Sequence, residues 1–144
     1  MAQMTETDEM LLQAAREAGK SAYCPYSGFP VGSAVATDIG IYTGCNIENA
    51  SYGLSVCAER VALFTAVAAG ARKIFGLAVS CLNAGEADAP GTRMPCGACR
   101  QILAEFMAPD ASVVIDGAGV WKVQELLPDA FQLDKRPFLN WRPV

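Results

Sequence analysis

Two short cysteine segments constrain this chain more than any other feature of its sequence. The first is Cys57-Ala58-Glu59, and the second, Pro95-Cys96-Gly97-Ala98-Cys99, follows later in the chain. An apolar helical pattern starts at each, so both segments are predicted at helix N-termini, where unpaired N–H groups and the helix dipole stabilise thiolates. Cys96 and Cys99 share one helical turn and face the same way. A fold that joins the two N-termini would therefore gather three thiolates.

The complete absence of histidine narrows the chemistry. A metal site must use Cys, Asp or Glu, and a general base must be something other than imidazole. Structural zinc sites are closed by four protein ligands, whereas catalytic sites keep three ligands and one open position. Three thiolates therefore favour catalytic zinc. Cys24, Cys45 and Cys81 lie in apolar settings and are predicted to be small buried apolar residues.

Three charged residues next to the cysteines are candidates for the chemistry. Glu59 lies two residues after Cys57, close enough to act as general acid and base at the open position. An isolated Cys-Ala-Glu would suit an exposed helix carboxylate equally well, but its pairing with Cys-x-x-Cys favours catalysis. The excess negative charge of three thiolates calls for a compensating cation, for which Arg60 or Arg100 is available.

The chain reads as one α/β domain covering residues 1–144, with an unassigned tail at 132–144. Met10, Leu11, Ala14 and Ala18 are predicted to form the apolar face of the first helix, and Met10 and Met107 to pack in the core. Alternation of strands and helices in the second half predicts parallel crossovers in a mixed sheet with helices on both faces. In chain order, the predicted elements are a helix at 5–20, strands at 31–37 and 41–45, a helix at 57–69, a strand at 73–82, a helix at 97–107, a strand at 112–116 and a short helix at 124–127.

The charge balance and the chain's apolar segments exclude several classes of protein. The net charge is −4, and the 11 Lys and Arg residues form no basic run that would hold nucleic acid. The first ten residues are polar and acidic, unlike a secretory signal. The longest nearly apolar stretch, 61–71, is too short to span a bilayer. We therefore expect a cytoplasmic protein without nucleic-acid or membrane partners.

Several linked motifs, in order, make the chain resemble the small homotetrameric zinc-dependent cytidine deaminases. The resemblance runs from the first helix to Phe131 and implies a three-layer α/β/α sandwich with a central mixed five-stranded sheet. The motifs are Tyr26-Ser27-Gly28-Phe29-Pro30-Val31-Gly32, Gly44-Cys45-Asn46-Ile47-Glu48-Asn49-Ala50-Ser51-Tyr52-Gly53, Cys57-Ala58-Glu59-Arg60, Pro95-Cys96-Gly97-Ala98-Cys99-Arg100-Gln101 and Leu126-Leu127-Pro128.

This resemblance implies hydrolysis of cytidine and deoxycytidine to uridine and deoxyuridine, with release of ammonia, as in pyrimidine salvage. One zinc ion per chain would be held by Cys57, Cys96 and Cys99, and Glu59 would carry every proton. A nucleoside would be the substrate, bound in active sites shared within a homotetramer. The implied roles are contact with base and sugar for Phe29, ribose hydrogen bonds for Asn46 and Glu48, a backbone contact to the amine for Ala58, pocket lining across subunits for Tyr52 and Phe131, and support of the thiolates for Arg60.

Other functions also fit parts of this pattern. A deaminase of another aminopyrimidine, such as the nucleoside antibiotic blasticidin S, would share the zinc motifs. A noncatalytic zinc module or a redox Cys-x-x-Cys protein would leave Glu59 and the ribose segment without a purpose. The chain also departs from the family pattern, with Ser33 where Ala is common, a long loop at 83–94, Met94 before Pro95, and the tail at 132–144. The loop and the tail bear on fine substrate preference and subunit contacts, not on the zinc chemistry.

Overall fold

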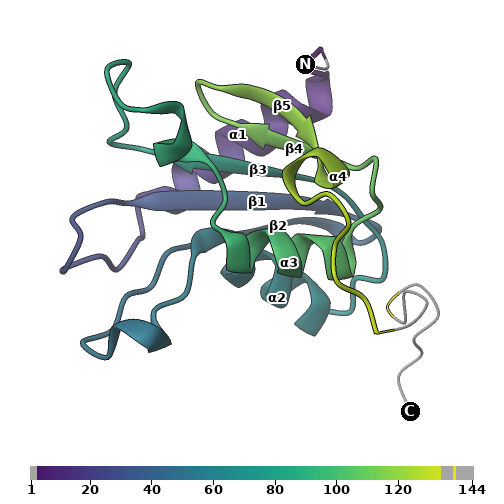
Figure 1. The fold of residues 1–144 in the computed structure, drawn as a ribbon, viewed down its shortest axis with the longest axis horizontal. Helices are drawn as coiled ribbons and strands as arrows, with labels where there is room; N and C mark the ends of the chain where they lie inside the picture. The colour runs from purple at the N-terminus through teal and green to yellow at the C-terminus, as the bar shows by residue number, and fades with distance from the viewer. Residues whose placement is uncertain (1–2, 134–137, 139–144) are drawn as a thin grey trace.

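A computed structural model describes residues 3–133 and residue 138 of this chain. Five strands form one sheet, and helices lie on both of its faces (Figure 1). The elements, in chain order, are α1 (Glu6–Gly19), β1 (Val31–Thr37), β2 (Gly40–Cys45), the 3₁₀ turn η1 (Tyr52–Leu54), α2 (Ala58–Ala68), β3 (Ile74–Cys81), the 3₁₀ turn η2 (Pro90–Arg93), α3 (Gly97–Phe106), β4 (Ser112–Ile115), β5 (Gly119–Lys122) and α4 (Val123–Leu126).

The sheet is mixed, with strand order β2-β1-β3-β4-β5. β1 pairs antiparallel with β2 and with β3, and β5 pairs antiparallel with β4. Among the described strands, the one parallel pair is β3 with β4, joined through α3 as the alternation of elements predicts. The predicted fold class is thus confirmed.

Alternate residues of the central strands supply two separate cores, which explains the three layers. Val35, Leu77 and Val113 point to the face covered by α2 and α3. Their neighbours Ala34 and Ala78 point to the opposite face, against α1. Because successive strand residues face opposite sides, strands that are apolar at nearly every position are buried on both faces.

The N-terminal helix begins where the sequence predicts, but its buried face differs from the prediction. Thr5 and Asp8 form a capping box at its start. Met10, predicted to lie in the core, is 55% exposed, whereas Leu12 and Ala15 are buried. Gly32 of β1 lets this face of α1 approach the strand closely, because a Cβ there would collide with the carbonyl oxygen of Ala15.

The last strand and two of the cysteines differ from the prediction, and part of the tail packs on α3. The last strand, β5, was not recognised in the residue pattern, although the family resemblance implied a fifth strand. Met107 and Cys81 are buried as predicted, whereas Cys24 and Cys45 are only half-buried. Of the predicted tail, only residues 132, 133 and 138 are described, and Phe138 packs edge-to-face on Phe106 of α3 with ring centroids 5.0 Å apart.

Asp116, directly after β4, ties α1 to the sheet and provides a stability prediction. Its carboxylate accepts hydrogen bonds from Arg16 at 2.7 and 2.8 Å and from the Ser80 hydroxyl at 2.7 Å. The hydrogen bonds from Arg16 are the main reason that the pKa of Asp116 lies below its ordinary value. We expect Asp116→Asn to lower the free energy of unfolding by ~1–3 kcal/mol at pH 7, measured by urea denaturation.

The stabilisation by Asp116 should weaken as the pH falls. Because the folded-state pKa of Asp116 is depressed, its contribution is present above the unfolded-state pKa of about 3.9 and is lost as the pH falls through the folded-state value. The stability difference between wild type and Asp116→Asn should therefore shrink in acid. As a control, Lys20→Gln breaks an exposed ion pair with Glu17 and should change stability by less than ~0.5 kcal/mol. Equal stability of Asp116→Asn and wild type at pH 7 would contradict the prediction.

Candidate active site

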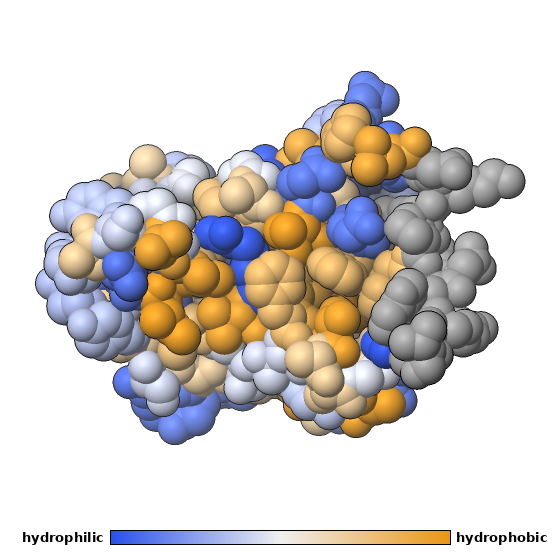
Figure 2. Space-filling view, turned by 90° about the horizontal axis from the view of Figure 1, so that it is seen from below, coloured by the Kyte–Doolittle hydropathy of each residue, from blue (hydrophilic) through white to orange (hydrophobic). Residues whose placement is uncertain are grey.

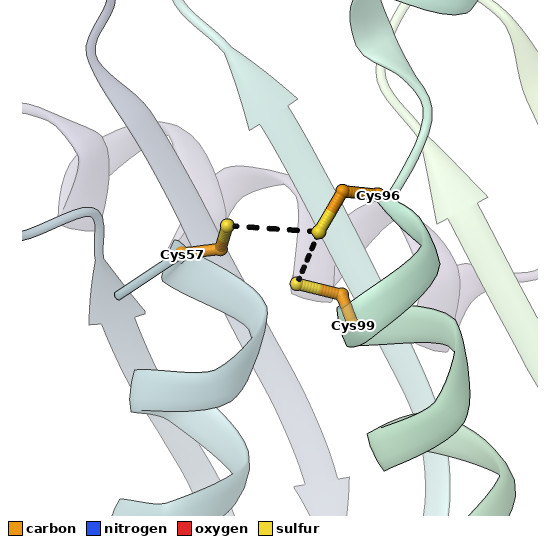
Figure 3. A group of neighbouring side chains, drawn as sticks. All are labelled: Cys57, Cys96 and Cys99. Atoms are coloured by element: carbon orange, nitrogen blue, oxygen red, sulfur yellow. Dashed lines mark hydrogen bonds between the residues drawn. The ribbon is translucent and has the colours of Figure 1, made fainter. Parts of the chain in front are cut away.

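The N-termini of α2 and α3 meet at one end of the sheet and bring three cysteines together. Cys57 is the N-cap residue of α2, Cys96 is the N-cap residue of α3, and Cys99 lies on the first turn of α3. Their sulfur atoms point toward one another (Figure 3), 3.9 Å apart for Cys57 and Cys96 and 3.4 Å apart for Cys96 and Cys99. All three sulfurs lie within 4.8 Å of one another. The predicted placement of both cysteine segments is confirmed.

This arrangement of sulfurs fits a tetrahedral zinc ion. A Zn–S distance of about 2.3 Å puts neighbouring sulfurs of a tetrahedron about 3.8 Å apart, close to the observed separations. Cys99 is fully buried whereas Cys96 is exposed, so one side of the cluster is accessible. Three thiol ligands leave the fourth position for a water molecule or substrate.

Gly44 of β2 allows α2 to lie where Cys57 can reach the cluster. A Cβ at this position would collide with the backbone nitrogen of Ala62 and lie 2.9 Å from the carbonyl oxygen of Ala58. The first turns of α2 therefore rest directly on the strand. The short distance between β2 and α2 is possible because Gly44 has no side chain.

Replacing Gly44 with alanine should push α2 away from the sheet. We expect a loss of ~1–3 kcal/mol in the free energy of unfolding from the forced overpacking, together with weaker zinc binding as Cys57 moves. Chemical denaturation and a competitive zinc titration measure the two effects. Gly53→Ala is the control for unfolding, because a Cβ there meets nothing within 4 Å. Unaltered stability and zinc affinity in Gly44→Ala would show that the close contact is unimportant.

Glu59 is a buried carboxylic acid beside the cysteine cluster. Its side chain is only 5% exposed, and its Oε2 atom accepts a hydrogen bond from the Cys99 thiol at 3.7 Å. Burial raises the pKa of Glu59 to about 7. A carboxyl group with this pKa can both accept and donate a proton near neutral pH.

Arg60 provides the positive charge next to the thiols. Its Nη2 atom lies 3.5 Å from Cys57 Sγ, and its buried Nε atom has no hydrogen-bond partner among the described residues. Interaction with the neighbouring Cys99 thiol lowers the pKa of Cys57 to about 5, and Arg60 adds to this effect. Arg100, the other candidate cation, instead donates to the carbonyl oxygens of Pro95 and Leu126. Of the two arginines, Arg60 is therefore the one with a contact to the cluster.

A pocket of about 250 Å³ opens over the cysteine cluster. Phe29, Asn46 and Ala58, three of the residues expected to bind substrate, line it together with Cys57, Glu59 and Cys96. The pocket therefore joins the acid–base group, the thiols and part of the expected recognition surface. The other described residues around it are Ser27, Val31, Cys81, Thr92, Arg93 and Met94.

Asn46 and Glu48 organise the loop that carries Phe29. Asn46 bridges this loop, accepting a hydrogen bond from Val31 N at 2.8 Å and donating one to Phe29 O at 2.8 Å. Glu48 Oε1 accepts hydrogen bonds from the backbone N–H groups of residues 26 and 27, and Glu48 is not among the described residues lining the pocket. Both side chains thus have structural partners within the chain.

The structure brings the two remaining expected residues to the surface rather than to this pocket. Tyr52 is 74% exposed and packs edge-to-face on Tyr26, while Phe131 is 69% exposed. The carbonyl oxygen of Phe131 accepts a hydrogen bond from Gln101 of α3 at 3.1 Å. Neither Tyr52 nor Phe131 is among the described residues that line the pocket of the same chain.

Sequence reasoning missed one wall of the pocket as a site. Cys81 at the end of β3 and the segment Thr92–Met94 form this wall, although Cys81 had been assigned only to packing. A usable signal was present in the position of Met94, directly before the Pro95-Cys96 pair. The loop before Met94 is long, so the sequence pattern did not indicate which of its residues lie beside the site.

A family model describing the "cytidine and deoxycytidylate deaminase zinc-binding region" matches residues 5–115, a span that includes both cysteine segments. The chain belongs to this family. Among relatives of this deaminase family, the chain is 44% identical over 128 residues to a cytidine deaminase of Sporosarcina psychrophila, covering 85% of this chain and 90% of the relative.

Solved structures of this deaminase family agree with the fold. The crystal structure of cytidine deaminase from Burkholderia pseudomallei is 45% identical, with a TM-score of 0.76 over 89% of this chain and all of that chain. The cytidine deaminase structure from Mycobacterium tuberculosis is 35% identical, with a TM-score of 0.74 over 90% of this chain and 100% of that chain. The chain is thus a zinc-binding deaminase in both sequence and fold. Within residues 3–133 and 138, no helix has the length and apolar character to cross a membrane.

Proposed function

We propose that this chain catalyses the hydrolytic deamination of cytidine and deoxycytidine to uridine and deoxyuridine, with release of ammonia. The observation that carries this proposal is the buried carboxyl group of Glu59 beside three convergent thiols at the base of a small pocket. Cys57, Cys96 and Cys99 would hold one zinc ion. When bound, zinc is a Lewis acid that makes a water molecule acidic enough to attack at neutral pH.

Glu59 performs the proton transfers of the reaction. Its carboxylate accepts a proton from the attacking water and delivers it to ring nitrogen N3 of the pyrimidine. A C–O bond forms at C4, and Glu59 then passes the second proton of the water to the exocyclic amine. The C4–N bond breaks, and the amine leaves as ammonia. A pKa near 7 allows one carboxyl group to act in both directions, which a chain without histidine requires.

Recognition of the nucleoside falls to the loops at the same end of the sheet. Phe29 contacts base and sugar, and the Ala58 backbone contacts the amine. Asn46 and Glu48 contact the ribose, using donor and acceptor positions that their hydrogen bonds within the loop leave free. Arg60 stabilises the thiolates. Arg93 also lines the pocket, but its Nη1 and Nη2 atoms are already engaged with backbone carbonyl oxygens. Free nucleosides, rather than nucleotides or nucleic acid, are therefore the proposed substrates.

The test of this function is a substrate comparison on zinc-loaded protein. Ammonia release and kcat/KM are measured for cytidine, deoxycytidine, cytosine and cytidine monophosphate at fixed ionic strength, with the zinc content of the same sample. We expect both nucleosides to be good substrates and the other two compounds to be poor, since a site built to bind a sugar hydroxyl rejects analogues that lack it. Blasticidin S is assayed alongside, and activity on it without activity on cytidine would refute the assignment.

The assembly that best fits the exposed aromatic residues is a homotetramer with shared active sites. Figure 2 shows apolar side chains gathered on the side of α2 and α3, where Phe64 of α2 is 44% exposed. Large exposed apolar patches often mark protein interfaces. Tyr52 and Phe131 would line the pocket of a neighbouring subunit. Light scattering at assay concentration tests this proposal, and a fully active monomer would refute it.

A reducing compartment suits this site. All six cysteines are free, and the three clustered thiols must stay reduced to bind zinc. We therefore propose that the enzyme works in the cytoplasm, in pyrimidine salvage. Cell fractionation followed by the cytidine assay tests the location.

A further inference from the structure

The pocket has three distinct walls, and the third has no role in the chemistry described so far. The N-termini of α2 and α3 supply the thiols and Glu59, and the loop before β1 supplies Phe29 with Asn46 behind it. The third wall consists of Cys81 and the segment Thr92–Met94, from the long loop after β3 at the upper left of Figure 1.

Arg93 locks this third wall in place. Its Nη2 atom donates to the carbonyl oxygens of Gly85 at 2.6 Å and Ala84 at 3.2 Å, and its Nη1 atom lies 3.3 Å from the Asp116 carbonyl oxygen. Gly117 makes room for this contact, since a Cβ there would lie 2.7 Å from Nη1. One guanidinium thereby joins the two ends of the loop to the turn after β4.

The backbone of the segment is also held from within. The thiol of buried Cys81 lies 4.0 Å from the carbonyl oxygens of Thr92 and Arg93. Met94 N donates to the Gly91 carbonyl oxygen at 3.2 Å, which closes η2. Fully buried Pro95 follows and leads directly into Cys96. Met94 therefore lines the pocket from a backbone that is fixed on both sides, and it also packs against the core beneath α2 and α3.

The proposed deamination, on which this inference rests, fixes which edge of the pyrimidine ring faces the third wall. The amine at C4 and ring nitrogen N3 must face the thiols and Glu59, and the sugar must face the loop of Phe29. The 5-position, next to C4 on the side away from N3, takes part in neither set of contacts. We propose that Met94 limits the size of the substituent at the pyrimidine 5-position, and that Arg93 is the positioning residue that holds Met94 there.

The test compares 5-iodocytidine with cytidine in wild type and in Met94→Ala. Both compounds are assayed on zinc-loaded protein, and the ratio of their kcat/KM values is compared between variants, so that the intrinsic reactivity of the iodinated ring cancels. We expect the ratio to rise at least about tenfold in Met94→Ala, the usual effect of creating space for an added group in an apolar pocket. Met94→Leu keeps the volume and should keep the wild-type ratio, whereas Met94→Phe should lower it. Met10→Ala, at an exposed position of α1, is the matched control and should leave the ratio unaltered.

Arg93→Lys tests the positioning role separately. Lysine keeps the charge, but its single ammonium group cannot join the same three carbonyl oxygens. We expect zinc to be retained, KM for cytidine to rise several-fold with a smaller change in kcat, and discrimination against 5-iodocytidine to relax. Loss of stability without a change in the ratio would assign Arg93 to folding alone and overturn its positioning role.

The outcomes separate this inference from the proposed function. A wild-type protein that does not deaminate cytidine refutes the function itself. A wild type active on cytidine, with a ratio unchanged within twofold in zinc-loaded Met94→Ala, overturns the role of Met94 and leaves the function intact. Should Met94→Ala fail to hold zinc, Met94→Thr, which removes less volume, and Met94→Phe provide the same comparison, and equal ratios in both would overturn the inference.

Discussion

Replacing Glu59 with glutamine is expected to lower kcat for cytidine by ~10²–10⁴, the usual contribution of a general acid–base group. Glutamine preserves the size of the side chain but can neither accept a proton from water nor donate one to the amine. Because the glutamine amide is neutral and Glu59 is not one of the three clustered thiols, zinc content should stay at one ion per chain. Steady-state kinetics, zinc analysis and nucleoside binding by calorimetry measure the three quantities.

The control for this substitution lies on α3. Glu105 is exposed, so Glu105→Gln makes the same chemical change away from the pocket and should leave turnover unaltered. A decrease of less than tenfold in Glu59→Gln would mean that another group carries the protons. Loss of zinc together with activity would instead show that Glu59 supports the metal site, which is a different role from the one proposed.

Replacing Cys99 with alanine is expected to abolish zinc binding and activity together. Cys99 is fully buried at the first turn of α3 and shares the cluster with Cys57 and Cys96, so its loss leaves only two thiol ligands. Metal that binds only the folded state stabilises it, by about 2.7 kcal/mol when free zinc is 100 times the dissociation constant. The melting temperature in zinc should therefore fall, with a loss of turnover to the limit of detection.

Cys24 supplies the matched control for the loss of a thiol. It is half-buried outside the cluster, and Cys24→Ala should retain one zinc ion per chain and the zinc-dependent gain in melting temperature. Metal analysis after gel filtration and thermal unfolding with and without a chelator make the comparison. A Cys99→Ala protein with full zinc and full activity would refute the assignment of the metal site.

Much of the architecture was predictable because its signals are local. Thr5 and Asp8 mark the start of α1 by a capping box, and Gly70, with a φ of 106°, follows the end of α2 as expected of a helix-terminating glycine. β5 escaped the residue pattern because it spans only Gly119–Lys122, with a positive φ both at its first residue and at Gly117 in the preceding turn. So short a strand is defined by its pairing with β4, which is not a local property.

The sequence by itself determined the chemistry of the site. Without histidine, only cysteine and carboxylate residues could form a zinc site, and the two cysteine segments at helix N-termini predicted Cys57, Cys96 and Cys99 as its ligands and Glu59 as the acid–base group. Residue types, their spacing and their place at a helix start are properties of short segments, so no knowledge of distant contacts was required.

Only the tertiary structure decided which side chains surround this chemistry. Arg60 rather than Arg100 contacts a thiol, because Arg100 is occupied by the carbonyl oxygens of Pro95 and Leu126. Met94 lines the pocket, and Arg93 ties its loop to the turn after β4. Such contacts join positions far apart in the chain, and their geometry depends on how the strands and helices pack. The pattern of one segment does not contain that information, and the packed fold supplies it.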